Sequence, residues 1–210
     1  MSKAKSTRQI ILEMLKKNDA LTANEMAAQL QITDIAVRRH LQSLEKDQLV
    51  QTKLVRQAMG RPTYAYTLTE SSELMFPKKY ADITLDFLQD VQELQGEAMI
   101  DSLFERREKR LREKYGQAMQ GQELEMRVGE LAQLQDDRGY MAEWQQDAAT
   151  GRYVLTEHNC PIHAVAHQFH QACSSELALF RNVLGADVQQ VECKAKGGHR
   201  CVYVVSPKAE

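Results

Sequence analysis

Apolar residues recur at steps of three and four positions through the first 46 residues, a spacing that places them on one face of a helix. The pattern predicts three short helices, over residues 6–17, 22–31 and 33–46. Thr22 and Glu25 have the spacing of a capping box at the start of the second helix, and Thr33 can cap the third. Two segments rich in Val, Thr and Tyr, 50–57 and 63–68, then predict a pair of strands.

Three helices followed by a two-stranded wing are the order of a winged helix-turn-helix domain, which we predict over residues 1–76. The third helix has a buried stripe made of Val37, Leu41 and Leu44. We expect DNA contacts from its outward positions and from the tip of the wing: Thr33, Asp34, Ile35, Arg38, Arg39, Gln42 and Arg61. The guanidinium and amide groups in this set can donate to base edges in the major groove, and Arg61 can enter a minor groove.

Charge is distributed unevenly along the chain. Residues 1–68 carry 11 Lys or Arg against 6 Asp or Glu, a net +5, and the overall charge of −2 therefore leaves −7 for the rest. A basic head on an acidic body indicates a polyanion partner for the head alone, and double-stranded DNA fits that role. The alternative is a winged helix that docks on another protein, with the arginines of the third helix forming only a solvated face.

The segments TANEMAAQLQIT, AVRRHLQSLEKDQLV and GRPTYAYTLT extend the comparison to known proteins. They resemble the winged-helix domains of DeoR-like and ArsR-like bacterial regulators over about the first third of the chain. The resemblance implies a DNA-binding transcriptional regulator.

After a break at Phe76-Pro77, an apolar stripe indicates further helix. The stripe consists of Ile83, Phe87, Val91, Leu94 and Ala98, and it continues through Met99, Ile100, Leu103 and Phe104. The run ERREKRLREKYG then predicts a solvated half supported by charge pairs, and 123–135 predicts another helix. We assign 77–138 as a helical segment that pairs two subunits, because helix-turn-helix proteins commonly read two half-sites. Packing within one chain is the alternative.

The last third, 139–210, has the pattern of a mixed α+β domain. Segments 140–146 and 152–157 predict a hairpin, and apolar residues from Pro161 to Gly185 predict one helix. Segments 188–196 and 199–205 predict a second hairpin around Gly197-Gly198. The whole chain is therefore expected to be α+β, with a winged helix-turn-helix, central helices and a cysteine-rich ligand domain.

All four cysteines lie in this last domain, at Cys160, Cys173, Cys193 and Cys201. No two form the CxxC pair of a zinc ribbon, and thiols in a cytosol stay reduced, so a shared metal or cluster is the leading interpretation. We expect Cys160 at the start of the helix and Cys173 three turns along it. A three-residue loop in the second hairpin would place Cys193 and Cys201 on one face, toward the interior.

Particular stretches around these cysteines are similar to a known family. The stretches are Asn159-Cys160-Pro161-Ile162, Ala172-Cys173, Glu176, Leu179-Phe180, Val191-Glu192-Cys193, Gly197 and Arg200-Cys201-Val202-Tyr203. They resemble SufR, the iron–sulfur-binding repressor of cluster-assembly genes, and with the winged helix the similarity covers nearly the whole chain. The resemblance implies a [4Fe-4S] cluster in each subunit of a homodimer, operator binding with the cluster present, and release when it is lost.

The family pattern separates four cysteines by twelve, thirteen and fourteen residues, and this chain departs from it. The first gap is met, Cys201 falls one residue short, and Asp187 stands where the third cysteine would be. Cys160, Cys173 and Cys201 therefore carry over as ligands, and Cys193 is the candidate for the fourth. His199 or an exogenous ligand is the alternative to Cys193.

Three other functions compete with cluster control. Zinc can occupy the same site, since four Cys, or three Cys and a His, bind it tetrahedrally. A metal-free thiol switch would instead join two cysteines on oxidation. A redox enzyme is disfavoured, because the sequence has no phosphate loop, nucleophile elbow or paired catalytic carboxylates, and we predict no catalytic residues.

Composition adds a prediction about location. The 210 residues are 43% hydrophobic and 27% charged, with no run near the roughly 20 apolar residues that span a bilayer. The start MSKAKSTRQI lacks an apolar signal core. We therefore expect a cytoplasmic protein without a membrane partner.

Overall fold

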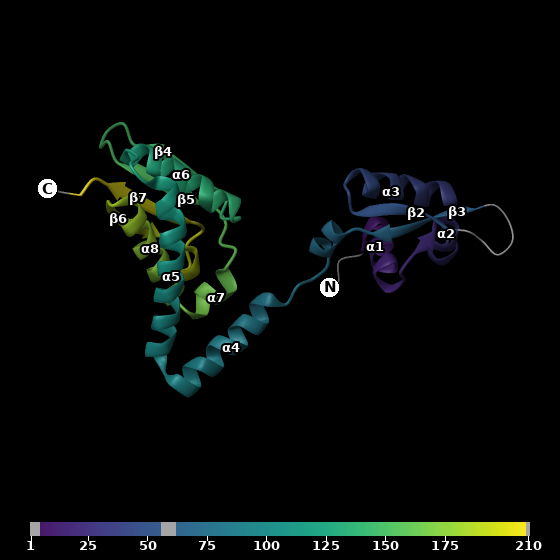
Figure 1. Ribbon diagram of the computed structural model, residues 1–210, viewed down its shortest axis with the longest axis horizontal. Helices are drawn as coiled ribbons and strands as arrows, with labels where there is room; N and C mark the ends of the chain where they lie inside the picture. Colours follow the sequence, from purple (N-terminus) through teal and green to yellow (C-terminus); the bar gives the residue numbers. More distant parts are fainter. Residues whose placement is uncertain (1–4, 56–61, 209–210) are drawn as a thin grey trace. The chain divides into compact units, whose positions relative to one another are not determined.

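The computed structural model describes residues 5–55 and 62–208, and its contacts divide the chain into two compact units (Figure 1). The first unit ends at Lys78 and the second begins at Lys79. The α+β class is confirmed, with the winged helix-turn-helix first, helices in the middle and a sheet in the last part. No helix among the described residues has the length and apolar character needed to cross a membrane.

The first unit has the predicted winged-helix order. Its helices are α1 (Thr7–Lys17), α2 (Ala23–Leu30) and α3 (Asp34–Lys46), followed by a 3-10 turn, η1 (Glu70–Met75). Its strands are β1 (Leu21–Thr22), β2 (Val50–Val55) and β3 (Thr63–Leu68), arranged antiparallel in the order β1-β3-β2. The short β1 was not predicted; it forms because Leu21 and Thr22 pair with Tyr66 and Ala65 of β3. Arg61 and the rest of the wing tip lie outside the described residues.

Local side-chain caps set the ends of these helices. Thr22 and Glu25 form the predicted capping box on α2, with Oγ1 of Thr22 accepting from the Glu25 backbone and Glu25 Oε2 accepting from the Thr22 backbone at 2.7 Å. Thr33 caps α3 through the Ala36 N–H at 3.2 Å, as predicted. Each cap satisfies backbone donors that a helix start leaves free.

The predicted stripe of α3 forms the centre of the first core. Val37, Leu41 and Leu44 are fully buried there against α1 and α2. Arg8 of α1 adds a polar clamp, since its guanidinium donates to Ser43 Oγ at 2.8 Å and to Asp47 at 2.6 Å. The core and the clamp together fix α3 on the body of the domain and leave its other face free.

The middle of the chain differs from the prediction in two ways. The helices are α4 (Tyr80–Gln95), α5 (Glu97–Met119) and α6 (Leu124–Asp137), so the expected continuous stripe is interrupted at Gly96, where φ is 80°. Most of the polar run in α5 is exposed and Arg112 pairs with Glu108, as predicted, but Tyr115 within the run is buried. Ile100 and Phe104 lie on the same stripe, so charged neighbours concealed an apolar face that packs into the second core.

The second unit places helices against one antiparallel sheet. Its strands are β4 (Ala142–Gln146), β5 (Tyr153–Glu157), β6 (Asp187–Glu192) and β7 (Cys201–Ser206), in the order β4-β5-β7-β6. Its further helices are α7 (His163–Gln168), α8 (Gln171–Leu184) and a 3-10 turn, η2 (Lys194–Lys196). Both predicted hairpin pairings, β4 with β5 and β6 with β7, are present. The core between the helices and the sheet contains residues of α5 and α6, so the helices assigned to 77–138 share one unit with the last domain.

Two predictions about the cysteine-bearing elements are wrong. The expected single helix breaks at Phe169, which is buried with φ −114° and ψ 86°, so Cys173 lies in the first turn of α8 rather than three turns along one helix. The loop between β6 and β7 is also longer than three residues, because β6 ends at Glu192 and β7 starts at Cys201. Val191 is 62% exposed at an irregularity in the strand register.

Candidate functional site: a recognition helix and a thiol pocket

The free face of α3 presents most of the side chains proposed to contact DNA. Thr33, Arg38, Arg39 and Gln42 are exposed, and Ile35 is 74% exposed. An apolar side chain this exposed on a rigid helix is typical of a contact surface, for example with a thymine methyl group. Thr33 has its hydroxyl engaged in the helix cap, which orients it at the start of the helix.

Asp34 differs from the other members of this set. It is only partly exposed, and its Oδ2 accepts from Arg38 Nε at 2.7 Å. The pKa of Arg38 is raised, first by this hydrogen bond and further by the charge of Asp34. Asp34 therefore holds Arg38 in one direction, and the two terminal nitrogens of the guanidinium remain free of this bond for a phosphate or a guanine.

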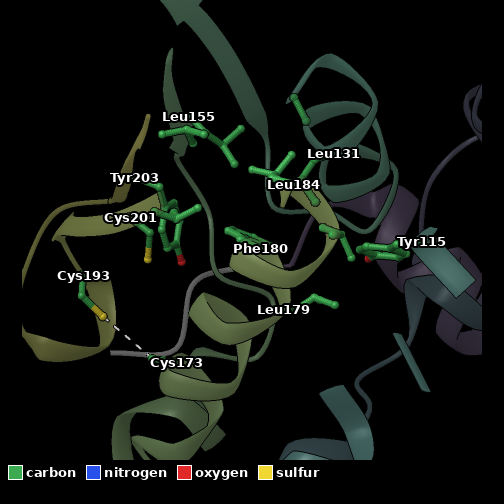
Figure 2. Close-up of a cluster of buried hydrophobic side chains, with 14 of the residues drawn as sticks. Tyr115, Leu131, Leu155, Cys173, Leu179, Phe180, Leu184, Cys193, Cys201 and Tyr203 are labelled. Carbon is green, nitrogen blue, oxygen red and sulfur yellow. Dashed lines mark hydrogen bonds between the residues drawn. The ribbon is translucent and has the colours of Figure 1, made fainter. Parts of the chain in front are cut away.

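Cysteines from separate elements of the second unit lie in or against its core, and we call this group of side chains the thiol pocket. Cys193 follows β6, Cys201 begins β7 and Cys173 lies on α8; all three are buried, and Figure 2 shows them at one side of the core. The sulfurs of Cys173 and Cys193 are 3.8 Å apart, too far for a disulfide, and all four cysteines are free thiols. Cys160, just before α7, is partly buried.

Burial raises the pKa of Cys160, Cys173 and Cys201 above the ordinary thiol range. Desolvation raises the pKa of Cys160 to about 11 and that of Cys201 to about 12, and it raises the pKa of Cys173 strongly. The charge of Cys193 adds to each of these three shifts, and its sulfur lies 3.8 Å from that of Cys173. A hydrogen bond from the Lys194 N–H, 3.4 Å from the Cys201 sulfur, acts in the opposite direction and lowers the pKa of Cys201. Thiols this hard to ionise alone become good ligands once a cation supplies the charge that stabilises a thiolate.

The donors are close together but not yet in a coordination geometry. Among residues 5–55 and 62–208, no three His, Cys, Asp or Glu side chains are arranged so that they would already hold a metal ion. His199, the alternative fourth ligand, is exposed in the β6–β7 connection, where its backbone N–H donates to Glu192 at 2.8 Å. A metal would therefore have to draw the thiols inward by small side-chain movements.

Two buried carboxyl groups beside the thiols were missed by the sequence analysis. Glu157 is 1% exposed and Glu176 is 7% exposed. Burial raises the pKa of both, and the charge of Glu176 raises that of Glu157 further. Alternation along β5 was the available signal, because Tyr153 and Leu155 point into the core and Glu157 is the next position on that face.

The glutamates have different hydrogen-bond partners. Glu176 Oε2 accepts from the Tyr203 hydroxyl at 3.4 Å. Glu157 Oε1 accepts from Gln135 Nε2 at 2.8 Å, but Glu157 Oε2 is buried without a hydrogen-bond partner. A buried oxygen without a partner is uncommon and requires an explanation.

Gly198 sets the shape of the connection that bears Cys193. A Cβ at this position would lie 2.9 Å from the Cys193 carbonyl oxygen and 2.8 Å from the Glu192 side chain. The Gly198 N–H donates to that same carbonyl at 3.0 Å. The backbone can approach this closely only because no side chain stands between the two segments.

The first unit defines the class of protein. Three helices, a two-stranded wing and an exposed basic recognition helix constitute a winged helix-turn-helix, and the chain is a DNA-binding transcriptional regulator of that type. Residues 7–54 match a family described as an HTH domain. No curated protein sequence matches the chain.

Several solved structures share part of the fold. A variant of ZitR from Lactococcus lactis is 22% identical over 44% of this chain and 75% of its own, with a TM-score of 0.29. A MepR variant from S. aureus is 22% identical over 47% and 70%, with a TM-score of 0.31. The adhesin competence repressor AdcR from Streptococcus pyogenes is 25% identical over 48% and 77%, with a TM-score of 0.29. ZitR is described as a zinc-responsive member of the MarR family, and AdcR as a repressor.

Proposed function

We propose that the chain is a transcriptional repressor whose operator binding is switched by a metal centre in the thiol pocket. The observation that carries the proposal is that four free thiols from separate elements share one core, with the sulfurs of Cys173 and Cys193 3.8 Å apart. The ligands we assign are Cys160, Cys173, Cys193 and Cys201. A cytoplasmic location fits this role, because such thiols stay reduced there.

A [4Fe-4S] cluster is the first candidate for the bound group, as the resemblance to SufR implies. Soft thiolates are the usual ligands of iron–sulfur clusters, and the pocket supplies them on α8, on β7 and on two connecting segments. Such a group would tie the start of α7 to α8 and to the sheet. The chain's own contribution is to give up the thiol protons and to shield the ligands from water.

Zinc is the second candidate, and one distance favours it. Two thiolates on a tetrahedral zinc ion, with Zn–S bonds of about 2.3 Å, are about 3.8 Å apart. The sulfurs of Cys173 and Cys193 have this separation already. Thiolates bound to different irons of a cluster would have to lie farther apart, so a cluster would require this pair to separate.

Anaerobic purification followed by iron, sulfide and zinc analysis distinguishes these candidates. A brown protein absorbing near roughly 400 nm indicates the cluster, and colourless protein with stoichiometric zinc indicates the ion. Duplex DNA selected from a randomised library with the metal-loaded protein would then be tested in gel shifts against chelated protein. We expect chelation, and Cys160→Ser, Cys173→Ser or Cys201→Ser, to abolish tight binding. Equal binding with and without metal would refute metal control, and loss of binding only on oxidation of metal-free protein would indicate a thiol switch.

We further propose that the regulator is a homodimer paired through α4. One face of α4 packs on the second core through Leu85, Leu88 and Val91. Its other face is an exposed apolar stripe at heptad-like spacing, formed by Tyr80 (71%), Ile83 (49%), Phe87 (62%) and Leu94 (78%). A second copy of the chain suits this stripe, because paired recognition helices are needed to read two half-sites of an operator.

Sedimentation of the purified protein tests the dimer. Phe87→Glu places a charge in the stripe and should convert the dimer to a monomer, since an unpaired charge would be buried at the seam. Glu93→Ala, on an exposed polar position of the same helix, is the matched control and should leave the dimer intact. A monomeric wild-type protein at micromolar concentration would contradict the proposal.

A further inference from the structure

The partnerless oxygen of Glu157 lies on the same face of the sheet as a proposed metal ligand. Glu157 is directly opposite Cys201 in the antiparallel pairing of β5 with β7. Residues opposite each other in such a pair project to the same face, with Cβ atoms about 4.5–5.5 Å apart. A carboxyl group and a thiol therefore stand side by side at this end of the sheet, and both are buried.

Helix α8, which packs in the same core, also carries one thiol and one carboxyl group. Cys173 and Glu176 are three residues apart on α8, so they occupy one face of the helix one turn apart. All four of these side chains are buried in the second unit. The strand pairing places Glu157 beside Cys201.

The contrast between the two glutamates indicates which one is available to a ligand. Glu176 Oε2 accepts from the Tyr203 hydroxyl at 3.4 Å, and neither oxygen of Glu176 is buried without a hydrogen-bond partner. Glu157 is anchored through Oε1 alone, and Oε2 has no hydrogen-bond partner. A buried acceptor without a partner is destabilising, and a cation bound at Oε2 would remove that penalty.

We propose that Glu157 supplies a carboxylate oxygen to the metal centre, beside the thiolate of Cys201 and in place of one of the four thiolates assigned above. The inference rests on the proposed function, because it assumes that the thiol pocket binds a metal. Carboxylate oxygen is an accepted zinc ligand at about 2.0–2.2 Å, and it combines with thiolates in mixed donor sets. Gln135 fixes the carboxyl orientation through Oε1, as the outer partners of metal ligands commonly do.

Anaerobic titration with Co²⁺, a coloured substitute for Zn²⁺, tests the assignment on the full-length protein. Glu157→Gln keeps the size and the bond to Gln135 but removes the anionic donor, and should weaken Co²⁺ binding at least about 10-fold and shift its visible d–d bands. Glu176→Gln is the matched control, since it neutralises a buried carboxyl that has no partnerless buried oxygen, and should leave the d–d bands unchanged. Unchanged affinity and bands in Glu157→Gln would overturn the inference.

A second measurement on the wild-type protein avoids any dependence on the folding of a variant. X-ray absorption at the zinc edge should show an oxygen shell near 2.0–2.2 Å in addition to sulfur near 2.3 Å. A shell of sulfur alone would overturn the role of Glu157 while leaving the thiolate centre in place. Failure of the wild-type protein to bind Co²⁺ or Zn²⁺ at all would overturn this inference; loss of the proposed function would additionally require that no iron binds.

Discussion

The two units of the chain differ in the burial of their proposed functional side chains. In the winged helix-turn-helix, most of the side chains proposed to read DNA are at the surface, and a cluster of hydrophobic side chains forms the core beneath them. In the second unit, the candidate ligands are themselves part of the core, where Cys173, Cys193 and Cys201 pack beside Phe180 and Tyr203 (Figure 2).

This difference has consequences for what each unit tolerates. A surface site can be altered without disturbing the fold that carries it, because the exposed side chains of α3 contribute little to packing. A site within a core links binding to stability, because the same side chains fill space and bind the ligand. Four experiments test that comparison.

The largest effect is expected from Leu41→Ala, which removes a fully buried side chain from the first core. Comparable substitutions cost about 2–5 kcal/mol. The single tryptophan, Trp144, lies in the second unit, so its fluorescence should report an unchanged denaturant midpoint while circular dichroism shows an earlier loss of helix. Gln42→Ala, on the exposed face of α3, is the control. Equal shifts in both signals would show that the units unfold together.

Arg39→Ala should weaken operator binding by about 1–3 kcal/mol, the range for a side chain that contacts a base or phosphate. Arg39 is exposed on α3. Because the change leaves the cores intact, the unfolding free energy and the metal content should stay constant. Binding isotherms at several salt concentrations provide the measurement, with Lys17→Ala as a control of equal charge change on α1. Equal losses in the two variants would indicate a nonspecific charge effect.

The buried glutamates should make the metal-free second unit less stable as pH rises. Burial raises the pKa of Glu157 and of Glu176 in the folded state, so their protons are retained longer there than in the unfolded chain. The stabilising contribution is complete below the unfolded pKa of about 4.3 and is lost as pH rises toward the folded values, at up to about 1.4 kcal/mol per pH unit for each proton.

Urea unfolding followed by Trp144 fluorescence, with a chelator present, measures this dependence. Glu157→Gln should flatten the slope, because one of the two titrating carboxyls is gone. The raised pKa values of Cys160 and Cys201 also make the folded state less stable as pH rises, but only above about pH 8.5, the ordinary pKa of a thiol. A stability that increases from pH 5 to pH 8 would contradict the expected burial effect.

The smallest effect is expected from Thr22→Ala, which removes the cap of α2 and should cost about 1 kcal/mol. Hydrogen bonds from the Thr22 backbone and side chain lower the pKa of Glu25, so the variant should also raise the pKa of that carboxyl toward its ordinary value. Thr22→Ser keeps the hydroxyl and should retain most of the stability. Carbon-detected NMR titration of Glu25 would report the change.

Prediction from the sequence was most accurate where structure is determined locally. The caps at Thr22 and Thr33 act over three residues, so the helix starts in the first unit could be located without knowledge of the fold. The buried stripe of α3 was likewise evident from its periodicity. The proposed roles of the exposed α3 side chains in reading DNA stay predictions.

The errors arose where tertiary packing decided the outcome. Phe169 interrupts the α7–α8 segment to enter the core, and nothing in the local apolar pattern signals that break. Tyr115 was hidden within a run of charges, and Glu157 looked like a surface residue although strand alternation placed it inward. In each case a side chain was judged by its type or its neighbours in the sequence, whereas its position on a helix or strand face determined its burial.

The close approach at Gly198 means that the spacing of the thiols depends on a residue with no functional group. Even the single methyl of Gly198→Ala would push on the carbonyl of Cys193 and so carry that sulfur away from Cys173. Such a variant would keep every donor atom, but the altered separation of the sulfurs would weaken metal binding. Genetic screens for loss of sensing should therefore recover changes at this glycine as readily as changes at the cysteines.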